Sequence, residues 1–282
     1  MKVTVLAENT AVSEAFACEH GLSLYIETTK HKILFDTGRG ELFAQNAAKL
    51  GIDPGQADIA FLSHGHYDHG GGIRTFLSMN AKAKIYIQPD AFGPYYSERP
   101  GGNTAFIGID PALKKSDRFV YAGTDLVIND ELRIFAQPPG HDLLSTGNAS
   151  LLQKIGNEYV QDNFTHEQSL LISDEGMTLL IAGCAHRGIV NIIENVKRKT
   201  SAFPQYVIGG FHLFNPAEKK AEEPALIREV GKYLKSTGAK FYTCHCTGIE
   251  PYQELKKLLG EYIDYAATGC VLQLHKGEKH YE

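Results

Sequence analysis

The sequence predicts an α/β protein in which two β-sheets face each other and helices cover their outer faces. Short apolar segments typical of buried strands alternate with segments that have the apolar spacing of helices, and both halves of the chain repeat one strand–helix–strand order. Twenty-eight residues separate Asp36 from His64 in the first half, and twenty-eight separate Cys184 from His212 in the second. In each pair the first residue ends one predicted strand and the second follows the next strand.

The first half has clear strand and helix signals. We expect strands at residues 3–6, 22–27 and 32–35, a helix over 41–50, a strand at 59–62, a helix over 72–79 and a strand at 84–87. The apolar run at 59–62 suits a buried strand, and it leads directly into a histidine-rich segment.

The middle of the chain is less regular. Residues 88–117 contain four prolines and four glycines, which predicts a long loop. We interpret this loop as a lid or a substrate-facing insertion, the alternative being a solvated surface loop. A second loop is expected over 137–150.

Regular structure returns in the second half. The pattern predicts strands at 169–172 and 178–181, a helix over 189–199, a strand at 206–208, a helix over 224–235, a strand at 240–243, a helix over 251–259 and strands at the end. No linker separates two parts, so residues 1–282 are predicted to form a single domain.

The composition excludes several classes of protein. A net charge of -5 argues against a general nucleic-acid binder but allows a local basic patch around an anionic small-molecule substrate. No apolar run approaches the roughly 20 residues of a membrane span, and Glu8 comes too early for a secretory leader, which favours a cytoplasmic protein without membrane contact. Five cysteines are too few and too scattered for a disulfide framework, and we expect reduced thiols.

The strongest chemical signal is a segment with three imidazoles and one carboxylate within six residues: His64, His66, Asp68 and His69. These are the usual ligand types for zinc, iron and manganese. An apolar strand precedes the segment, and three glycines after it allow a tight turn into a helix. This setting favours a metal site over a solvated histidine-rich loop.

The His-x-His-x-Asp-His order after a short strand, with Phe-Asp-Thr-Gly around Asp36 upstream, resembles the signature of the metallo-β-lactamase superfamily. The resemblance implies a four-layer αββα sandwich that binds two divalent metal ions. Zinc is the preferred metal, and iron and manganese are the alternatives. It further implies that His64 and His66 bind one metal and that Asp68 and His69 bind the other. Asp36 would not bind the metals itself but would orient the residues that do.

The remaining ligands must come from the second half of the chain. Cys184 stands at a strand end where the superfamily usually has an aspartate, and a thiolate is a good zinc ligand. His186, two residues later, is our preferred substitute for the superfamily's loop histidine, with Asp162 and His166 as alternatives. We expect the late ligand to be His245. A buried thiol and ordinary loop residues are the competing interpretations.

Other cysteines and histidines receive weaker predictions. Cys244 and Cys246 flank His245, and on an extended chain they would point away from it, which argues against a Cys-His-Cys metal site. His212 ends another strand and is interpreted as a proton donor or substrate contact, the alternative being a satisfied core histidine. His20 is a weaker candidate of the same kind. Three more histidines are expected on the surface: His141, His275 and His280.

Four further segments narrow the resemblance. Glu-His-Gly-Leu-Ser at 19–23, Gly-Cys-Ala-His at 183–186, Gly-Gly-Phe-His-Leu at 209–213 and His-Cys-Thr-Gly at 245–248 resemble a branch of metal-dependent hydrolases related to dihydropterin–ribofuranosylaminobenzene 5′-phosphate synthase.

We expect an enzyme, and three functions are in competition. The first is a hydrolase that uses a metal-activated water on an ester, lactone or phosphoester, with Asp68 or His212 moving protons. The second is a dihydropterin-alkylating synthase that releases pyrophosphate. The third is a non-catalytic metal- or ligand-binding protein.

Overall fold

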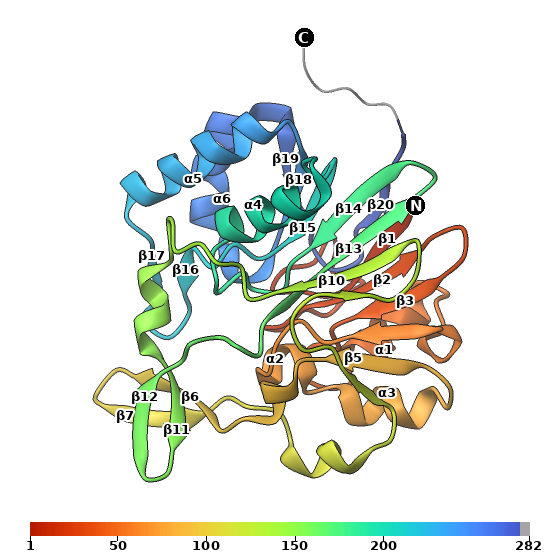
Figure 1. The fold of residues 1–282 in the computed structure, drawn as a ribbon, viewed down its shortest axis with the longest axis horizontal. Helices are drawn as coiled ribbons and strands as arrows, with labels where there is room; N and C mark the ends of the chain where they lie inside the picture. The colour runs from red at the N-terminus through yellow and green to blue at the C-terminus, as the bar shows by residue number, and fades with distance from the viewer. Residues whose placement is uncertain (277–282) are drawn as a thin grey trace.

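Two seven-stranded sheets form the centre of the protein, and the computed structural model describes residues 1–276 (Figure 1). The first sheet has the spatial order β20 (Val271–Gln273), β1 (Lys2–Ala7), β2 (Ser23–Glu27), β3 (Lys32–Phe35), β4 (Ile59–Phe61), β5 (Lys84–Ile87) and β8 (Phe119–Tyr121). The second has the order β19 (Ile263–Tyr265), β18 (Lys240–Thr243), β15 (Tyr206–Gly209), β14 (Met177–Ile181), β13 (Gln168–Asp174), β10 (Leu132–Ala136) and β9 (Leu126–Val127). His280 lies outside the described residues.

Helices cover the outer face of each sheet, which confirms the predicted four-layer αββα arrangement. The first sheet carries α1 (Leu42–Lys49) and α3 (Ile73–Met79), and the second carries α4 (Ile189–Thr200), α5 (Pro224–Thr237) and α6 (Ile249–Leu259) (Figure 1). Within residues 1–276, none of the helices combines the length and the apolar character that crossing a membrane requires.

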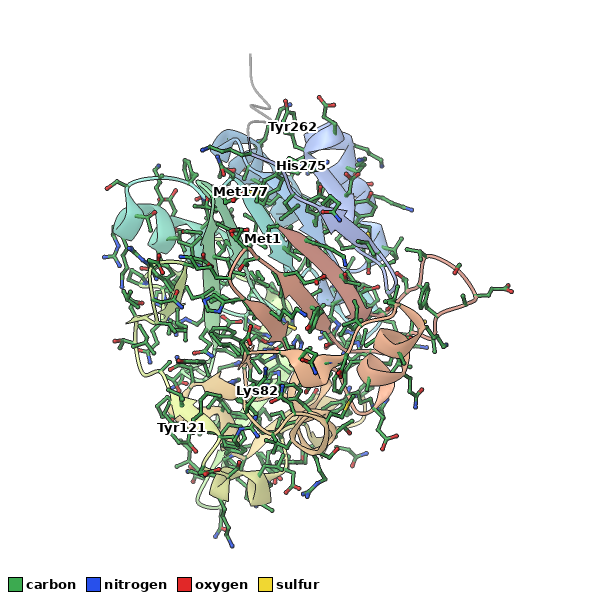
Figure 2. All side chains as sticks on the ribbon, turned by 90° about the vertical axis from the view of Figure 1, so that its right-hand side faces the viewer. Met1, Lys82, Tyr121, Met177, Tyr262 and His275 are labelled. Carbon is green, nitrogen blue, oxygen red and sulfur yellow. The ribbon has the colours of Figure 1, made fainter. Side chains whose placement is uncertain are left out.

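Alternating side chains of the strands fill three apolar layers. In β14, Leu179 and Ile181 belong to the cluster between the two sheets, whereas Leu180 points into the cluster beneath the helices. Both faces of a central strand are therefore buried, which explains why the strand segments are apolar along their length. Met177 and the partly buried Met1 belong to the cluster between the sheets; both are labelled in Figure 2.

The repeat seen in the sequence corresponds to two parallel strand pairs. β3 and β4 are parallel neighbours, and the chain between them contains α1. β14 and β15 are likewise parallel neighbours, and the chain between them contains α4. Parallel neighbours end at the same edge of a sheet, so the residues that follow them are brought together. The repeat therefore places Asp36 near His64 in one sheet and Cys184 and His212 at neighbouring strand ends in the other.

The prediction of an irregular loop over 88–117 is wrong. This segment contains a β-hairpin, β6 (Tyr95–Arg99) and β7 (Asn103–Phe106), which pairs with a second hairpin, β11 (Leu151–Ile155) and β12 (Glu158–Gln161), to make a four-stranded sheet. Gly101 and Gly102 have φ angles of 92° and 79°, and they close the hairpin turn because glycine adopts positive φ without steric cost. The glycines and prolines mark turns between short strands, and their density concealed the strands. We call this sheet the insert.

Glycine is required where the histidine-rich segment enters α3. A Cβ atom on Gly72 would lie 2.3 Å from the carbonyl oxygen of Thr37 and 2.4 Å from that of Gly40. We predict that Gly72→Ala lowers the free energy of unfolding by about 2–3 kcal/mol, since backbone atoms must shift to accept the methyl group. Gly40→Ala is the matched control because a Cβ there meets no atom within 4 Å. Urea unfolding of both variants measures the effect, and equal stabilities would contradict it.

Candidate metal centre

Side chains from both sheets meet at the edge where the parallel strands end. His64 follows β4, His186 comes shortly after β14, and His245 follows β18. Asp68 and His69 lie on α2 (Tyr67–Gly70), a single helical turn that precedes the predicted helix and that the sequence did not indicate.

The backbone turns sharply after the strands that carry this edge. Four residues there have positive φ although they are not glycine: Asp36 at 57° and Ala185, His212 and His245 at 51° each. This conformation costs free energy in non-glycine residues and is commonly retained at functional sites. These turns redirect the chain from the strands into the site.

One cluster contains His64, His66 and His186. Their ligand atoms lie within 4.8 Å of one another, and the Nε2 atoms of His64 and His186 are 3.4 Å apart. All three rings are buried, and Nε2 of His66 has no hydrogen-bond partner among the described residues. A buried ring nitrogen without a partner is costly, and a metal ion would satisfy it.

A second cluster lies beside the first. Asp68 Oδ2 is 3.2 Å from His20 Nε2 and 3.3 Å from His245 Nε2. His69 Nε2 is 3.1 Å from His245 Nε2 and 3.1 Å from the Cys184 thiol. His69 and Cys184 also group with His64, so these two side chains connect the clusters.

The outward-facing nitrogens of four rings are held by other side chains. The Nδ1 contacts are His64 with Ser63 Oγ at 2.9 Å, His69 with Asp36 Oδ2 at 2.6 Å, His186 with Asn148 Oδ1 at 3.1 Å, and His245 with Asn9 Oδ1 at 2.8 Å. Such contacts fix the ring orientation and leave Nε2 facing the site, as is usual for metal-binding histidines.

These contacts also define the protonation of His69 and His245. The Nδ1 atoms of both rings donate to oxygen acceptors, so in the neutral rings both Nε2 atoms carry lone pairs. In that form two lone pairs face each other across 3.1 Å, which favours a cation against them. The cation can be a proton, since Asp36 and Asp68 raise the pKa of His69 despite its burial, or a metal ion. The donor set of imidazole, carboxylate and thiol suits a divalent cation such as zinc.

Burial and neighbouring charges set the ionisation of the clusters. Burial lowers the pKa of His64, His66 and His186, and repulsion from the other imidazoles lowers those of His64 and His186 further. Burial would raise the pKa of Asp68, but the positive charge of the adjacent His69 and the contacts with His20 and His245 outweigh it and hold that pKa well below the usual range. Neutral imidazoles and an ionised carboxylate are the forms that bind metals.

The two alternatives to His186 are already engaged in other contacts. His166 Nδ1 accepts the main-chain N–H of Gly65 at 2.9 Å, and its Nε2 contacts Asp162 Oδ2 at 3.0 Å. Both ring nitrogens of His166 are thus used within the protein, whereas Nε2 of His186 faces His64. The geometry favours His186 as the partner of His64 and His66.

The expectation that Cys246 points away from His245 is wrong. The left-handed turn at His245 and the short helix His245–Thr247 replace the extended chain on which that expectation rested. The ligand atoms of Cys184, His245 and Cys246 lie within 4.8 Å of one another, so Cys246 belongs to the site. All five cysteines are free, and burial raises the pKa of the Cys184 thiol well above its usual value.

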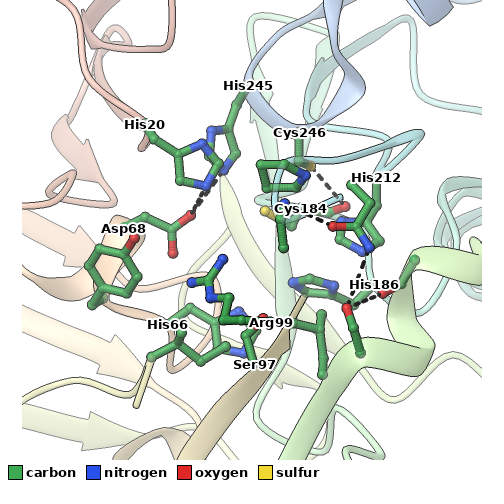
Figure 3. A pocket seen from close by; sticks show the side chains of 18 residues that line it. His20, His66, Asp68, Ser97, Arg99, Cys184, His186, His212, His245 and Cys246 are labelled. Atoms are coloured by element: carbon green, nitrogen blue, oxygen red, sulfur yellow. Dashed lines mark hydrogen bonds and ion pairs between the residues drawn. The ribbon is translucent and has the colours of Figure 1, made fainter. Parts of the chain in front are cut away.

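A cavity of about 120 Å³ opens over the two clusters (Figure 3). His20 and His212 both line it, as expected. Both buried ring nitrogens of His212 lack a hydrogen-bond partner among the described residues, which favours a role in the cavity over a satisfied core histidine. His141 and His275 are exposed, as expected.

Two buried carboxylates that the sequence did not single out support the site. Glu8 accepts the main-chain N–H of His245 at 2.7 Å, and Glu167 accepts those of His186 at 2.6 Å and Arg187 at 2.8 Å. Glu8 lies more than 200 residues from His245 in sequence, so no local pattern connects them.

Asp36 holds two parts of the site at once. Its carboxylate accepts hydrogen bonds from the main-chain N–H and the hydroxyl of Ser63, both at 2.7 Å, and from His69 Nδ1 at 2.6 Å. An asparagine at this position cannot accept all three. We predict that Asp36→Asn weakens metal affinity by about 10- to 100-fold, measured by competition with a chromophoric chelator. The exposed Asp58→Asn is the control, and equal affinities for zinc in the two variants would count against this role.

Comparisons with known proteins agree with the fold and the motifs. The family model described as the metallo-beta-lactamase superfamily matches residues 17–228. A 7,8-dihydropterin-6-methyl-4-(beta-D-ribofuranosyl)-aminobenzene-5′-phosphate synthase of Methanocaldococcus jannaschii is 30% identical, over 97% of this chain and 96% of its own. An uncharacterized protein of the same organism is 28% identical, over 91% and 94%. The crystal structure of Tm1679, a metal-dependent hydrolase of the beta-lactamase superfamily, is 28% identical and superposes with a TM-score of 0.80, covering 97% of this chain and 99% of that one.

Proposed function

The chain belongs to the metallo-beta-lactamase superfamily, and from this premise we propose that it is a metal-dependent hydrolase of small-molecule esters, lactones or phosphoesters. The main support for this proposal is the pair of adjoining clusters, each with at least three buried ligand groups, at the floor of one cavity. Membership makes an enzyme that binds divalent metals the natural expectation, and the cavity gives a small substrate access to the clusters.

These clusters would hold two divalent cations, and zinc is the preferred metal. His64, His66 and His186 would bind one, and Asp68 and His245 the other. His69 and Cys184 lie between them and complete the ligand set, with Asp36 orienting His69. Cations bound there would lower the pKa of water from ~15.7 towards ~7 and stabilise negative charge on the substrate.

The chain's own residues would move the protons. Asp68 lies in contact with both His20 and His245, so its carboxylate can accept a proton from water entering the cavity. His212 lines the same cavity, its ring nitrogens have no hydrogen-bond partner within residues 1–276, and it can donate a proton to the leaving group. The cluster side chains are buried, which limits bulk water near the reacting groups and strengthens electrostatic interactions there.

A second function has support from one relative. The synthase of Methanocaldococcus jannaschii matches nearly the whole chain, so a dihydropterin-alkylating reaction that releases pyrophosphate is the alternative. In that case the same ligand residues would bind the leaving pyrophosphate through the metals. The crystal structure described as a metal-dependent hydrolase supports the first function at a similar level of identity.

Turnover separates these functions. We predict that protein loaded with zinc, iron or manganese hydrolyses model esters, lactones or phosphodiesters, and that a chelator abolishes the activity. His212→Asn should retain its metal and lower kcat by about 10²- to 10⁴-fold, because it removes a proton donor. His141→Ala, an exposed histidine, is the control with unchanged kcat.

Metal-loaded protein that hydrolyses none of these substrates would reject the hydrolase. Release of pyrophosphate from a dihydropterin pyrophosphate would then establish the synthase. Metal binding with neither reaction would leave a non-catalytic binding protein.

A further inference from the structure

We infer that Arg99 of the insert binds an anionic group of the substrate, a carboxylate or a phosphate, away from the reacting bond. This inference rests on the proposed function, since it assigns a substrate class to the same cavity. Arg99, Ser97 and Ile107 of the insert region line the cavity, together with ligand side chains of both clusters (Figure 3).

The alternation of β6 directs Arg99 to the site. Successive side chains of a strand point to opposite faces, so Tyr95, Ser97 and Arg99 share one face and Tyr96 and Glu98 share the other. Tyr95 and Ser97 are 1% and 4% exposed, and Ser97 and Arg99 both line the cavity. Glu98 is exposed and does not line the cavity. The arginine therefore belongs to the face of the insert that looks toward the metal ligands.

Main-chain contacts fix the insert to the histidine-rich segment. The N–H of Ile107 donates to Tyr95 at 2.9 Å, and the carbonyl of Ile107 accepts the N–H of Tyr67 at 2.8 Å. A β-bridge joins His66 to Gly108 on the same path. The position of Arg99 relative to the clusters is thus set by the fold, and not by a free loop.

The guanidinium of Arg99 lacks an internal partner. Arg99 is half-buried, and within residues 1–276 no ion pair or hydrogen bond satisfies its side chain. Arg74, by contrast, is paired with Asp110 although both are exposed. Arginine binds carboxylates and phosphates with two parallel hydrogen bonds, and a partly desolvated, unpaired guanidinium is suited to receive such a group.

His212 gives a second, independent indication of a ligand in the cavity. His212 is 7% exposed, and its two ring nitrogens have no partner among the described residues. The cavity lining also includes Ile107, Leu151 and Pro216, which are apolar. The cavity therefore suits a small molecule with an apolar body, an anionic group at the insert and its reacting group at the clusters.

Non-hydrolysable ligands test this inference without turnover. Phenylphosphonate, 4-phosphonobenzoate and 1,4-phenylenediphosphonate share one phosphonate for the metals and differ in the second anionic group. Calorimetry with zinc-loaded wild type should show that one or both of the ligands with a second anionic group bind about 10- to 100-fold more tightly than phenylphosphonate. The carboxylate and phosphonate arms identify which anion Arg99 prefers.

Arg99→Gln should remove this preference and leave phenylphosphonate affinity unchanged, which also shows that the variant is folded. Arg99→Lys should retain part of the preference, and Glu98→Gln, on the opposite face of β6, should retain all of it. Equal binding of the three ligands by wild type, or a preference that survives Arg99→Gln, would overturn the inference. Because only binding is measured, absent turnover would count against the hydrolase and not against this anion site.

Discussion

Hydrogen bonds from main-chain N–H groups to three buried carboxylates hold the turns from which the site is built. Asp36 holds the start of the histidine-rich segment, Glu167 holds the turn at His186, and Glu8 holds the turn at His245. Each carboxylate comes from a different part of the chain than the turn it binds, and the contact of Glu8, which follows β1, with the turn after β18 joins the two sheets. Charge-assisted hydrogen bonds of this kind are stronger than neutral ones, which suits turns that adopt left-handed backbone.

The same interactions make the site costly without a cation. Asp36 and Asn9 hold the Nδ1 atoms of His69 and His245, respectively. The Nε2 atoms of these two rings face each other across 3.1 Å. The Nε2 atoms of His64 and His186 also face each other, 3.4 Å apart, and burial lowers the pKa of both rings, so they are not readily protonated to relieve that repulsion. A bound metal would convert facing lone pairs into ligand bonds, which couples metal binding to the stability of the fold.

Local patterns in the sequence predicted the fold and the histidine-rich segment of the metal site. The run from His64 to His69 is contiguous, and the equal spacing of Asp36 to His64 and Cys184 to His212 corresponds to two parallel strand pairs. The sequence did not predict the strands of the insert, because they are short and the turns between them are rich in glycine and proline. Cys246 was misplaced because the left-handed turn at His245 has no glycine to signal it. Contacts such as Glu8 with His245 join distant segments, and only the tertiary structure shows them.

The most direct measurement is anomalous diffraction at the zinc edge from crystals of the zinc-loaded protein. We predict two zinc ions in the cavity floor, one bound by His64, His66 and His186 and the other by Asp68 and His245. A single zinc ion, or zinc bound elsewhere while these side chains keep their contacts with one another, would contradict the two-metal centre.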